Sequence, residues 1–261
     1  MLRGIYTAAS GMLADQRRLD VIANNLANAS TLGYKRDTSI TQAFNDFFVI
    51  RRNDEDPGKT QESTLVGLLS FGSLISHTAS RLTTGALRAT GNPLDVAITG
   101  DGFFTVSTPQ GLRYTRQGSF AQDGADRLVT ESGLPVMVDG HEVAGPPGSL
   151  TITQNGEVKS GDQVLGKLSV TSTARLGSIR KEGTGLWVPV SPGEPSALVT
   201  PAEANGVYDL KVGYLESANV EPVTEMVEMM TTVRSYEANQ KAIQAMDETL
   251  QKAVTEVGRI G

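Results

Sequence analysis

Apolar and small residues recur at helical spacing near the N-terminus of the chain. Steps of four and three residues alternate over about three heptads, at Ile5, Ala9, Met12, Gln16, Leu19, Ala23 and Leu26. This spacing predicts a helix that packs against another helix, as in a coiled coil. Because two of these side chains are alanines and one is a glutamine, the helix buries little apolar area and is marginal alone. Ser30, Thr31 and Gly33 follow as signals that end it, with Gly33 as the expected C-cap.

The C-terminal part repeats the spacing in two stretches. The first stretch is Val223, Met226, Met230 and Val233, and the second is Ile243, Met246, Leu250, Ala253 and Val257. The pattern changes phase in the polar segment SYEANQK between them. With Pro222 in the first turn, we expect one helix from about residue 220 to residue 257. A helix of that length is more typical of a coiled coil or an assembly than of an isolated domain.

The middle of the chain has the pattern of short strands. Turn pairs separate them at Asp101-Gly102, Asp123-Gly124, Asp139-Gly140 and Asn155-Gly156. The strand-like runs are LDVAI (94–98), GFFTVS (102–107), LRYTR (112–116), RLVT (127–130), PVMV (135–138) and SLTIT (149–153). They predict an antiparallel barrel or sandwich. The expected fold class is therefore α+β, with paired N- and C-terminal coiled-coil helices and a β-rich middle. Two polar stretches, 51–63 and 190–206, are expected to be loops.

Composition narrows the possible partners. The chain has 261 residues, of which 39% are hydrophobic and 20% charged, as in globular proteins. A net charge of -6 and a pI near 5.1 argue against a nucleic-acid partner. No apolar run reaches the ~18 residues of a membrane span, and no cleavable secretory signal is recognisable. The chain is therefore expected to stay in the cytoplasm or to leave by a route that reads no such signal.

The two ends of the chain carry opposite charge. Residues 1–36 hold five basic and two acidic residues, a net of +3, whereas residues 207–261 hold five basic and nine acidic residues, a net of -4. Opposite charge favours pairing of the two predicted helices, although exposed ion pairs contribute at most about 1 kcal/mol each.

The residues that usually carry chemistry are sparse. Without cysteine there is no disulfide, thiolate metal site or cysteine nucleophile. His77 and His141 stand alone, so no metal site is expected. The segment AITGDGFF (97–104) lacks the spacing of a nucleotide loop, and QDGADRLVTES lacks that of a calcium loop. Asp95 and Asp101 have no convergent partner, and Asp before Gly is ordinary in turns. We predict no catalytic residue, no metal and no cofactor.

Three asparagines, Asn24, Asn25 and Asn28, lie within five residues of the first predicted helix. Asparagine is a poor helix former because its amide competes for backbone hydrogen bonds. One interpretation is that these amides face water. The other is that they pair with neighbouring helices and set the register of an assembly.

Four blocks resemble the bacterial flagellar rod and hook proteins. They are SGMLADQRRLDVIANNLANASTLGYKRD (10–37), LDVAITGDGFFTV (94–106), YTRQGSFAQDGADRLVTESGLPV (114–136) and GYLESANVEPVTEMVEMMTTVRSYEANQKAIQAMDETLQKA (213–253). Their order and their spread over nearly the whole chain make the resemblance specific. Within the family, the length of the chain and the motifs GDGFF and YTRQGSF favour the distal rod type. NPLDVAI and GTGLWVP (183–189) are also similar to its proximal-rod sister.

The resemblance implies an architecture and a place of action. Residues 1–36 and 213–261 would form an inner helical tube, residues 37–92 a connecting β-rich segment that stiffens the shaft, and residues 93–212 an outer β domain. The chain would polymerise with itself in the rod of the basal body, contact other rod and hook proteins, transmit torque and leave the cell through the flagellar type III export apparatus. The heptad residues above and the three asparagines would form the self-assembly interface.

A reading of a different class starts from the same elements. Terminal helices could hold an extracytoplasmic β-domain enzyme or adhesin as an oligomer. An enzyme requires convergent polar groups, and the sequence offers none. The four blocks therefore favour the polymer.

Overall fold

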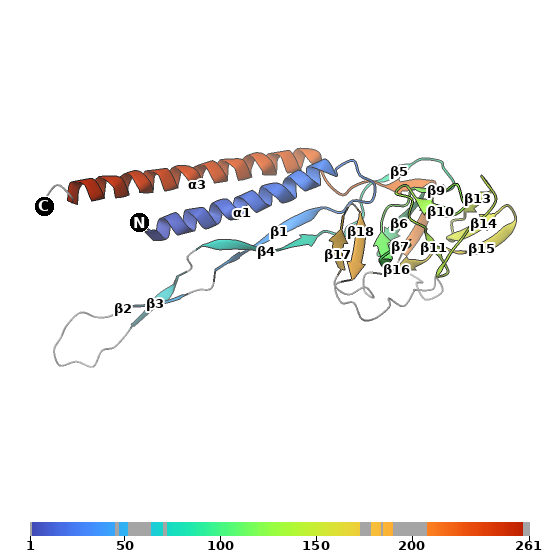
Figure 1. The fold of residues 1–261 in the computed structure, drawn as a ribbon, viewed down its shortest axis with the longest axis horizontal. Coiled ribbons are helices and arrows are strands. Elements are labelled where there is room, and N and C mark those ends of the chain that lie inside the picture. Colours follow the sequence, from blue (N-terminus) through green and yellow to red (C-terminus); the bar gives the residue numbers. More distant parts are fainter. Residues whose placement is uncertain are drawn as a thin grey trace. The chain divides into compact units, whose positions relative to one another are not determined.

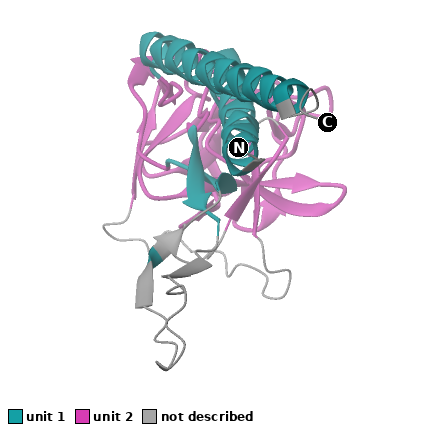
Figure 2. Ribbon diagram, turned by 90° about the vertical axis from the view of Figure 1, so that its left-hand side faces the viewer, with its two compact units in different colours: residues 1–27, 37–81, 221–261 teal, residues 28–36, 82–220 magenta. Residues whose placement is uncertain are grey.

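The computed structural model describes residues 2–44, 47–51, 64–69, 72–172, 179–183, 185–189 and 208–257. The chain divides into two compact units (Figure 2). Unit 1 comprises residues 1–27, 37–81 and 221–261, and unit 2 comprises residues 28–36 and 82–220. The expected loop at 190–206 lies outside the described residues, as does the loop at 51–63 except for Arg51.

Unit 1 contains the two helices that the heptad spacing predicts. Helix α1 spans Leu2–Ala27, and helix α3 spans Pro222–Val257 and lies alongside it (Figure 1). Pro222 is the first residue of α3, where a missing N–H costs nothing and the fixed φ suits a helix. The prediction that Gly33 caps α1 is wrong, because the helix ends at Ala27. Gly33 has a positive φ of 65°, and its N–H donates to the carbonyl of Glu216 at 2.8 Å.

The rest of unit 1 is a β ribbon. Strand β1 (Asp37–Ala43) pairs antiparallel with β4 (Ser73–Ser80), and β2 (Phe47–Arg51) pairs with β3 (Thr64–Leu69). α1 packs against β1 and β4 (Figure 1). A two-stranded ribbon is at best marginally stable alone, so α1 supplies the support that a third strand gives elsewhere.

Unit 2 is built from antiparallel strands, and each of the six predicted strand-like runs overlaps one of them. Its largest sheet has five strands in the order β16-β7-β8-β18-β17. The strands are β5 (Leu87–Ala89), β6 (Val96–Gly100), β7 (Phe103–Thr108), β8 (Gly111–Thr115), β9 (Phe120–Gln122), β10 (Leu128–Thr130), β11 (Met137–Val138), β12 (His141–Glu142), β13 (Leu150–Ile152), β14 (Glu157–Ser160), β15 (Gln163–Lys167), β16 (Val170–Thr171), β17 (Ile179–Glu182), β18 (Leu186–Pro189), β19 (Tyr208–Val212) and β20 (Tyr214–Glu216). A closed barrel, one of the two predicted arrangements, does not form among the described strands. β16 and β17 stand at the two ends of the largest sheet and do not pair with each other, so the described pairings leave its edges open.

The core of unit 2 lies on both faces of β7. Phe104 joins a large apolar cluster and meets the ring of Phe120 edge-on, with 5.0 Å between centroids. Its neighbour Phe103 points to the opposite face, where it packs with Tyr114 and Trp187. Because successive residues of one strand fill two separate clusters, β7 is central to the unit and depends on no other copy of the chain for burial.

One predicted turn shows why its residues are needed. Asp139 and Gly140 have φ of 46° and 82° and connect β11 to β12. A two-residue hairpin loop with both φ angles positive is the type that favours Asp-Gly.

Candidate assembly surfaces of the terminal helices

Helices α1 and α3 run antiparallel and keep one register over their shared length. At one end, Asn25 Nδ2 donates to Glu225 Oε2 at 3.2 Å. At the other end, Gly4 lies under Met246, since a Cβ added to Gly4 would be 2.7 Å from the methionine sulfur. From Gly4 to Asn25 the chain advances 21 residues along α1, and from Met246 back to Glu225 it retreats by the same number along α3. The contact therefore covers nearly all of α1.

Polar pairs occupy the middle of this contact. Asp15 Oδ2 accepts hydrogen bonds from Ser235 Oγ at 2.9 Å and from Asn239 Nδ2 at 3.2 Å. Arg18 and Glu228 form an exposed ion pair at 4.0 Å, the kind of interaction that opposite helix charges predict. Small and polar residues thus set the helix register, while apolar burial between the helices is limited.

The face of α1 that meets α3 is not the predicted stripe. Its residues lie one position earlier at each step of the heptad, at Gly4, Ala8, Gly11, Asp15, Arg18, Ile22 and Asn25. The most apolar face of the helix therefore lies to one side of the contact. Glycine and alanine allow close approach of two helices, and the side-chain hydrogen bonds fix their register.

The predicted stripe of α1 lies beside this contact face. Gln16 and Ala23 are exposed, and the half-buried members are Ile5, Ala9, Met12, Leu19 and Leu26. Two large apolar side chains outside the heptad were missed: Tyr6 is 72% exposed and Leu13 is 64% exposed. Their signal in the sequence is weak, because a single-helix pattern does not distinguish a second apolar face from noise.

On α3 the apolar stripe changes face at the segment SYEANQK. After it, Ile243 and Met246 are half-buried on the face toward α1. Before it, that face carries Glu225 and Thr232, which are 1% and 4% exposed. The apolar stripe thus moves from one face of α3 to another within a single helix.

The first half of the predicted α3 stripe lies on the opposite face and is exposed. Val223 is 69% exposed, Met226 47%, Met230 54% and Val233 38%, and Val227, which the heptad did not include, is 51% exposed. These five residues are called the outer stripe below. They lie in consecutive turns, so their exposed surfaces adjoin. Contiguous apolar patches of this kind mark interaction sites.

The end of α3 extends beyond α1. By the shared register, residues after about 250 pass the start of α1. Leu250 is half-buried, Ala253 is exposed, and Val257 is the last residue of the helix. Val254, which was not predicted, is 70% exposed. Within this unit the last two turns of α3 thus have no part of α1 beside them.

Asn25 has a role inside the chain. Its side chain exchanges two hydrogen bonds with the backbone of Asp37, at 2.8 Å to the carbonyl and 2.9 Å from the N–H. Its second amide hydrogen binds Glu225, and both side chains belong to residues that are 1% exposed. One amide therefore joins α1, the start of β1 and the first turn of α3. By contrast, Asn24 is exposed, and Asn28 accepts from Thr31 Oγ1 at 3.2 Å.

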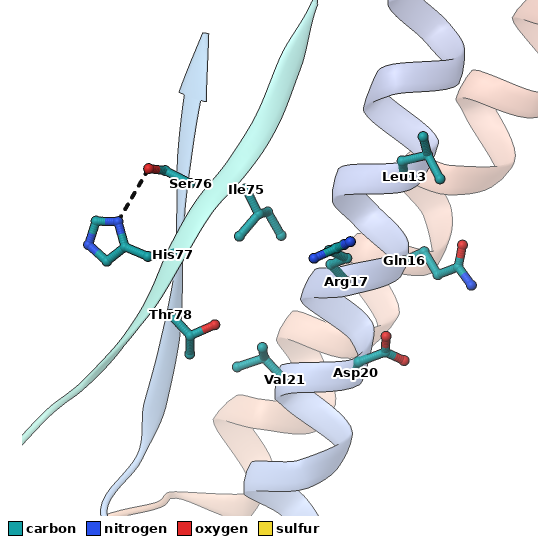
Figure 3. A pocket seen from close by; sticks show the side chains of 9 residues that line it. All are labelled: Leu13, Gln16, Arg17, Asp20, Val21, Ile75, Ser76, His77 and Thr78. Atoms are coloured by element: carbon teal, nitrogen blue, oxygen red, sulfur yellow. Dashed lines mark hydrogen bonds between the residues drawn. The ribbon is translucent and has the colours of Figure 1, made fainter. Parts of the chain in front are cut away.

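A pocket of about 560 Å³ lies between α1 and β4 (Figure 3). Its walls combine apolar and charged side chains: Leu13, Gln16, Arg17, Asp20 and Val21 from α1, and Ile75, Ser76, His77 and Thr78 from β4. Ile75 and Thr78 point toward the helix, whereas Ser76 and His77 lie on the far side of the strand (Figure 3). The register shift at Ile40/Thr41 explains this, because an extra residue in a strand breaks the alternation of its side chains.

The candidate chemical residues have separate surroundings. Asp95 accepts from Asn92 Nδ2 at 3.1 Å, and Asp101 accepts from Ser172 Oγ at 2.8 Å. Across the described residues, no group of three or more metal-ligating side chains gathers. No helix in the described part of the chain combines the length and hydropathy needed to cross a membrane.

Comparison with known proteins finds similarity to flagellar rod and hook proteins. Three family models match: "Flagella basal body rod protein" over residues 5–35, "Flagellar hook protein FlgE/F/G D1 domain" over 97–184 and "Flagellar basal body rod FlgEFG protein C-terminal" over 211–256. The chain is 32% identical to the flagellar hook-basal body complex protein FlhO of Bacillus subtilis, covering all of both chains. It is 34% identical to the flagellar basal-body rod protein FlgG of the same organism, covering 97% of this chain and 98% of the relative. It is 31% identical to the rod protein FlgF of Caulobacter vibrioides, again covering all of both chains.

Proposed function

Because the chain belongs to the family of flagellar basal-body rod and hook proteins, we propose that it is a structural subunit of the rod, which assembles with copies of itself into a helical tube and transmits torque to the hook. It acts in the basal body and contacts other rod and hook proteins there. It reaches that place through the flagellar type III export apparatus.

The outer stripe is the observation that supports self-assembly most directly. A helix in a monomeric protein places its apolar face on its own core. Here α3 does so only after the phase change, and the preceding stretch presents Val223, Met226 and Met230 to solvent. Fully burying a side chain of this size contributes about 1.5–3 kcal/mol. Burial of these five residues by neighbouring copies would favour association.

We extend the interface to the remaining heptad residues. The half-buried stripe of α1 adjoins its α3-contacting face, so a helix from another copy can cover it while α1 keeps its contact with α3. On α3 the outer stripe and the free last turns, with Leu250, Ala253 and Val257, provide contacts at both ends of the helix. In this proposal α1 and α3 form an antiparallel coiled coil. Asn25 fixes the register inside each copy, and Asn24 and Asn28 contribute at the contact between copies.

In this proposal three parts of the chain have different roles. Residues 1–36 and 213–261 line the inner tube, residues 37–92 stiffen the shaft, and residues 93–212 form the outer β domain, with a sandwich-like core. In this role the chain needs no catalytic residue, cofactor, metal or nucleic acid. The acidic net charge of -6 supports the last point, since phosphate binding needs a basic surface.

Between the two rod positions we propose the distal one. The length of 261 residues and the motifs GDGFF and YTRQGSF support it. The alternative is the proximal-rod sister, since relatives named FlgF and FlgG are similarly close to this chain.

Electron microscopy of basal bodies from a strain that lacks the gene tests the proposal. A rod that stops short of its distal part and carries no hook makes the chain the distal subunit. A rod that is absent or stops earlier assigns it to the proximal position. A complete and motile flagellum would refute the function in both forms.

A further inference from the structure

A buried carboxylate in unit 2 binds three separate parts of the chain. Glu216, the last residue of β20, accepts hydrogen bonds through Oε1 from Lys35 Nζ at 2.6 Å and from the N–H of Gly85 at 2.8 Å. Its Oε2 lies 3.5 Å from Arg116 Nη1. The carbonyl of Glu216 also accepts from the N–H of Gly33, at 2.8 Å. We call these contacts the Glu216 cluster.

Asn219 adds a second connection between the same segments. Its Oδ1 accepts from the N–H of Arg36 at 2.6 Å, and its Nδ2 donates to the carbonyl of Thr83 at 3.0 Å. Lys35 Nζ also donates to the carbonyl of Thr83, at 2.9 Å. Segments 28–36, 82–86 and 214–220 are therefore joined to one another by side chains, in addition to their backbone contacts.

These segments have a common place in the chain. The chain passes between the two units four times, after residues 27, 36, 81 and 220. The unit 2 residues next to all four passages belong to the three segments that the Glu216 cluster joins. Contacts within unit 2 thus join the three segments through which the chain leaves that unit.

Because the Glu216 cluster is buried, its stability depends on the charge of the Glu216 carboxylate. The side chains of Lys35, Arg116 and Glu216 are each 1% exposed. Burial lowers the pKa of Lys35, and the neighbouring Glu216 opposes that shift. Buried ion clusters are often no more stabilising than apolar residues of the same volume, but removal of one partner is strongly destabilising. Arg116 Nη1 and Nη2 also donate to the carbonyls of Ile98 and Gly100, at 3.1 and 2.6 Å, so the cluster extends to β6.

We infer that Glu216 is a positioning residue that ties the four chain passages together inside unit 2, so that force on the β domain is shared among them. If the passages were independent, they would be loaded and opened one after another. With the Glu216 cluster intact, segments 28–36, 82–86 and 214–220 move as one body. The sharing of load rests on the proposed function, whereas the joining of the segments does not.

Hydrogen exchange of the purified chain tests the joining of the segments. Glu216→Gln keeps the shape of the side chain and removes the charge, and Glu142→Gln is the matched control, because Glu142 pairs with Arg127 at the surface. We expect exchange of the Gly33, Arg36 and Gly85 amides to rise at least about tenfold in Glu216→Gln, while β7 and β8 stay protected. The control should change none of these rates.

A role in general stability gives a different pattern. Uniform loss of protection across unit 2, or unchanged rates at Gly33 and Gly85, would overturn the inference. If Glu216→Gln does not fold, Lys35→Met is measured in the same way. It should raise exchange at Arg36 but not at Gly85, because Glu216 still accepts from the Gly85 N–H. Equal changes at both amides, or none, would count against the cluster.

Motility tests the sharing of load. In cells with Glu216→Gln as the only copy, we expect rods of normal length and a swimming speed that falls more steeply with viscosity than in the Glu142→Gln strain. Equal viscosity dependence in the two strains would overturn load sharing. Failure of the unaltered chain to build rods would instead refute the proposed function, and the exchange results would still stand.

Discussion

Large apolar side chains fill the core of unit 2, whereas many of those in unit 1 are exposed. Phe103 and Phe104 are 0% exposed, and Trp187 is 2% exposed. Tyr6 and Val223, on the helices of unit 1, are 72% and 69% exposed. The hydrophobic effect favours burial equally in both places, so the exposed surface of unit 1 supports the proposal that other copies of the chain cover it.

The contacts inside the two units differ in how much apolar area they bury. Unit 2 is held by two apolar clusters, whereas α1 and α3 meet through glycines, Asp15, Asn25 and a few hydrogen bonds. Such a helix pair has a defined register but buries little apolar area. We therefore expect unit 2 to fold by itself and unit 1 to complete its folding in the proposed assembly.

The largest expected effect comes from placing charge on the outer stripe. Met226→Glu with Met230→Glu should abolish rod assembly and motility, because covering the stripe would then bury two unpaired carboxylates. The melting temperature of the purified chain should change by no more than about 2 °C, since both residues are exposed. Counting rods in purified basal bodies and recording thermal unfolding test both parts.

The conservative pair Met226→Leu with Met230→Leu serves as the control for this experiment. Leucine preserves apolar volume, so assembly should continue. If the glutamate pair assembles as well as the leucine pair, the stripe is not an interface.

A cavity made by substitution in the core of unit 2 tests the difference in stability between the two units. Phe104→Ala removes a fully buried ring from the larger cluster and should lower the free energy of unfolding of unit 2 by about 3–5 kcal/mol. Leu13→Ala, on exposed α1 surface, should change the stability of the purified chain by less than about 0.5 kcal/mol. Denaturant unfolding is followed by Trp187 fluorescence for unit 2 and by far-ultraviolet circular dichroism for the helices of unit 1. Similar losses in the two variants would remove the contrast between the units.

Asn25→Ala should have an intermediate effect. It leaves the carboxylate of Glu225 and the backbone of Asp37 without an amide partner in a buried site, at a cost of about 1–3 kcal/mol. Faster hydrogen exchange in the last turns of α1 and the first turn of α3 is the expected sign. Asn24→Ala, at the adjacent exposed position, is the control. If the two variants behave alike, Asn25 does not set the register.

The smallest effect concerns a turn in unit 2. The N–H groups of Arg127 and Ala125 donate to Asp123 at 2.8 and 2.9 Å, and these bonds, with the Arg127 side chain, lower the pKa of Asp123. A depressed folded-state pKa means that the stabilisation is present above the unfolded value near 3.9 and is lost as pH falls through the folded value. An NMR titration of the Asp123 carboxyl should therefore give a midpoint below about 3.9. A midpoint at or above that value would contradict these hydrogen bonds.

Local signals were enough to predict both helices and six of the strands. Pro222 and the heptads located α3, and Asp-Gly pairs such as Asp139-Gly140 located turns. The face of α1 that meets α3 is shifted by one residue from the heptad stripe, for a physical reason. The spacing selects the most apolar face, but Gly4, Asp15 and Asn25 show that close approach and hydrogen bonding decide which face meets α3.

Contacts between distant segments could not be predicted. Lys35, Arg116 and Glu216 lie far apart in the chain, and each is an ordinary charged residue in its local sequence. The local pattern predicts Gly33 as a helix cap, because it cannot reveal a hydrogen-bond partner at residue 216. The same limit applies to Asn25, whose partners Asp37 and Glu225 become adjacent only in the folded unit.

The outer stripe can be tested directly by cysteine accessibility, since the natural chain has no cysteine. Single cysteines replace Met230 on the stripe and Asp162, an exposed residue of unit 2. Each variant is treated with a maleimide as purified chain and in intact basal bodies. The account predicts that M230C reacts in the purified chain and is protected in basal bodies, while D162C reacts in both. Equal labelling of M230C in the two states would contradict the claim that neighbouring copies cover this face of α3.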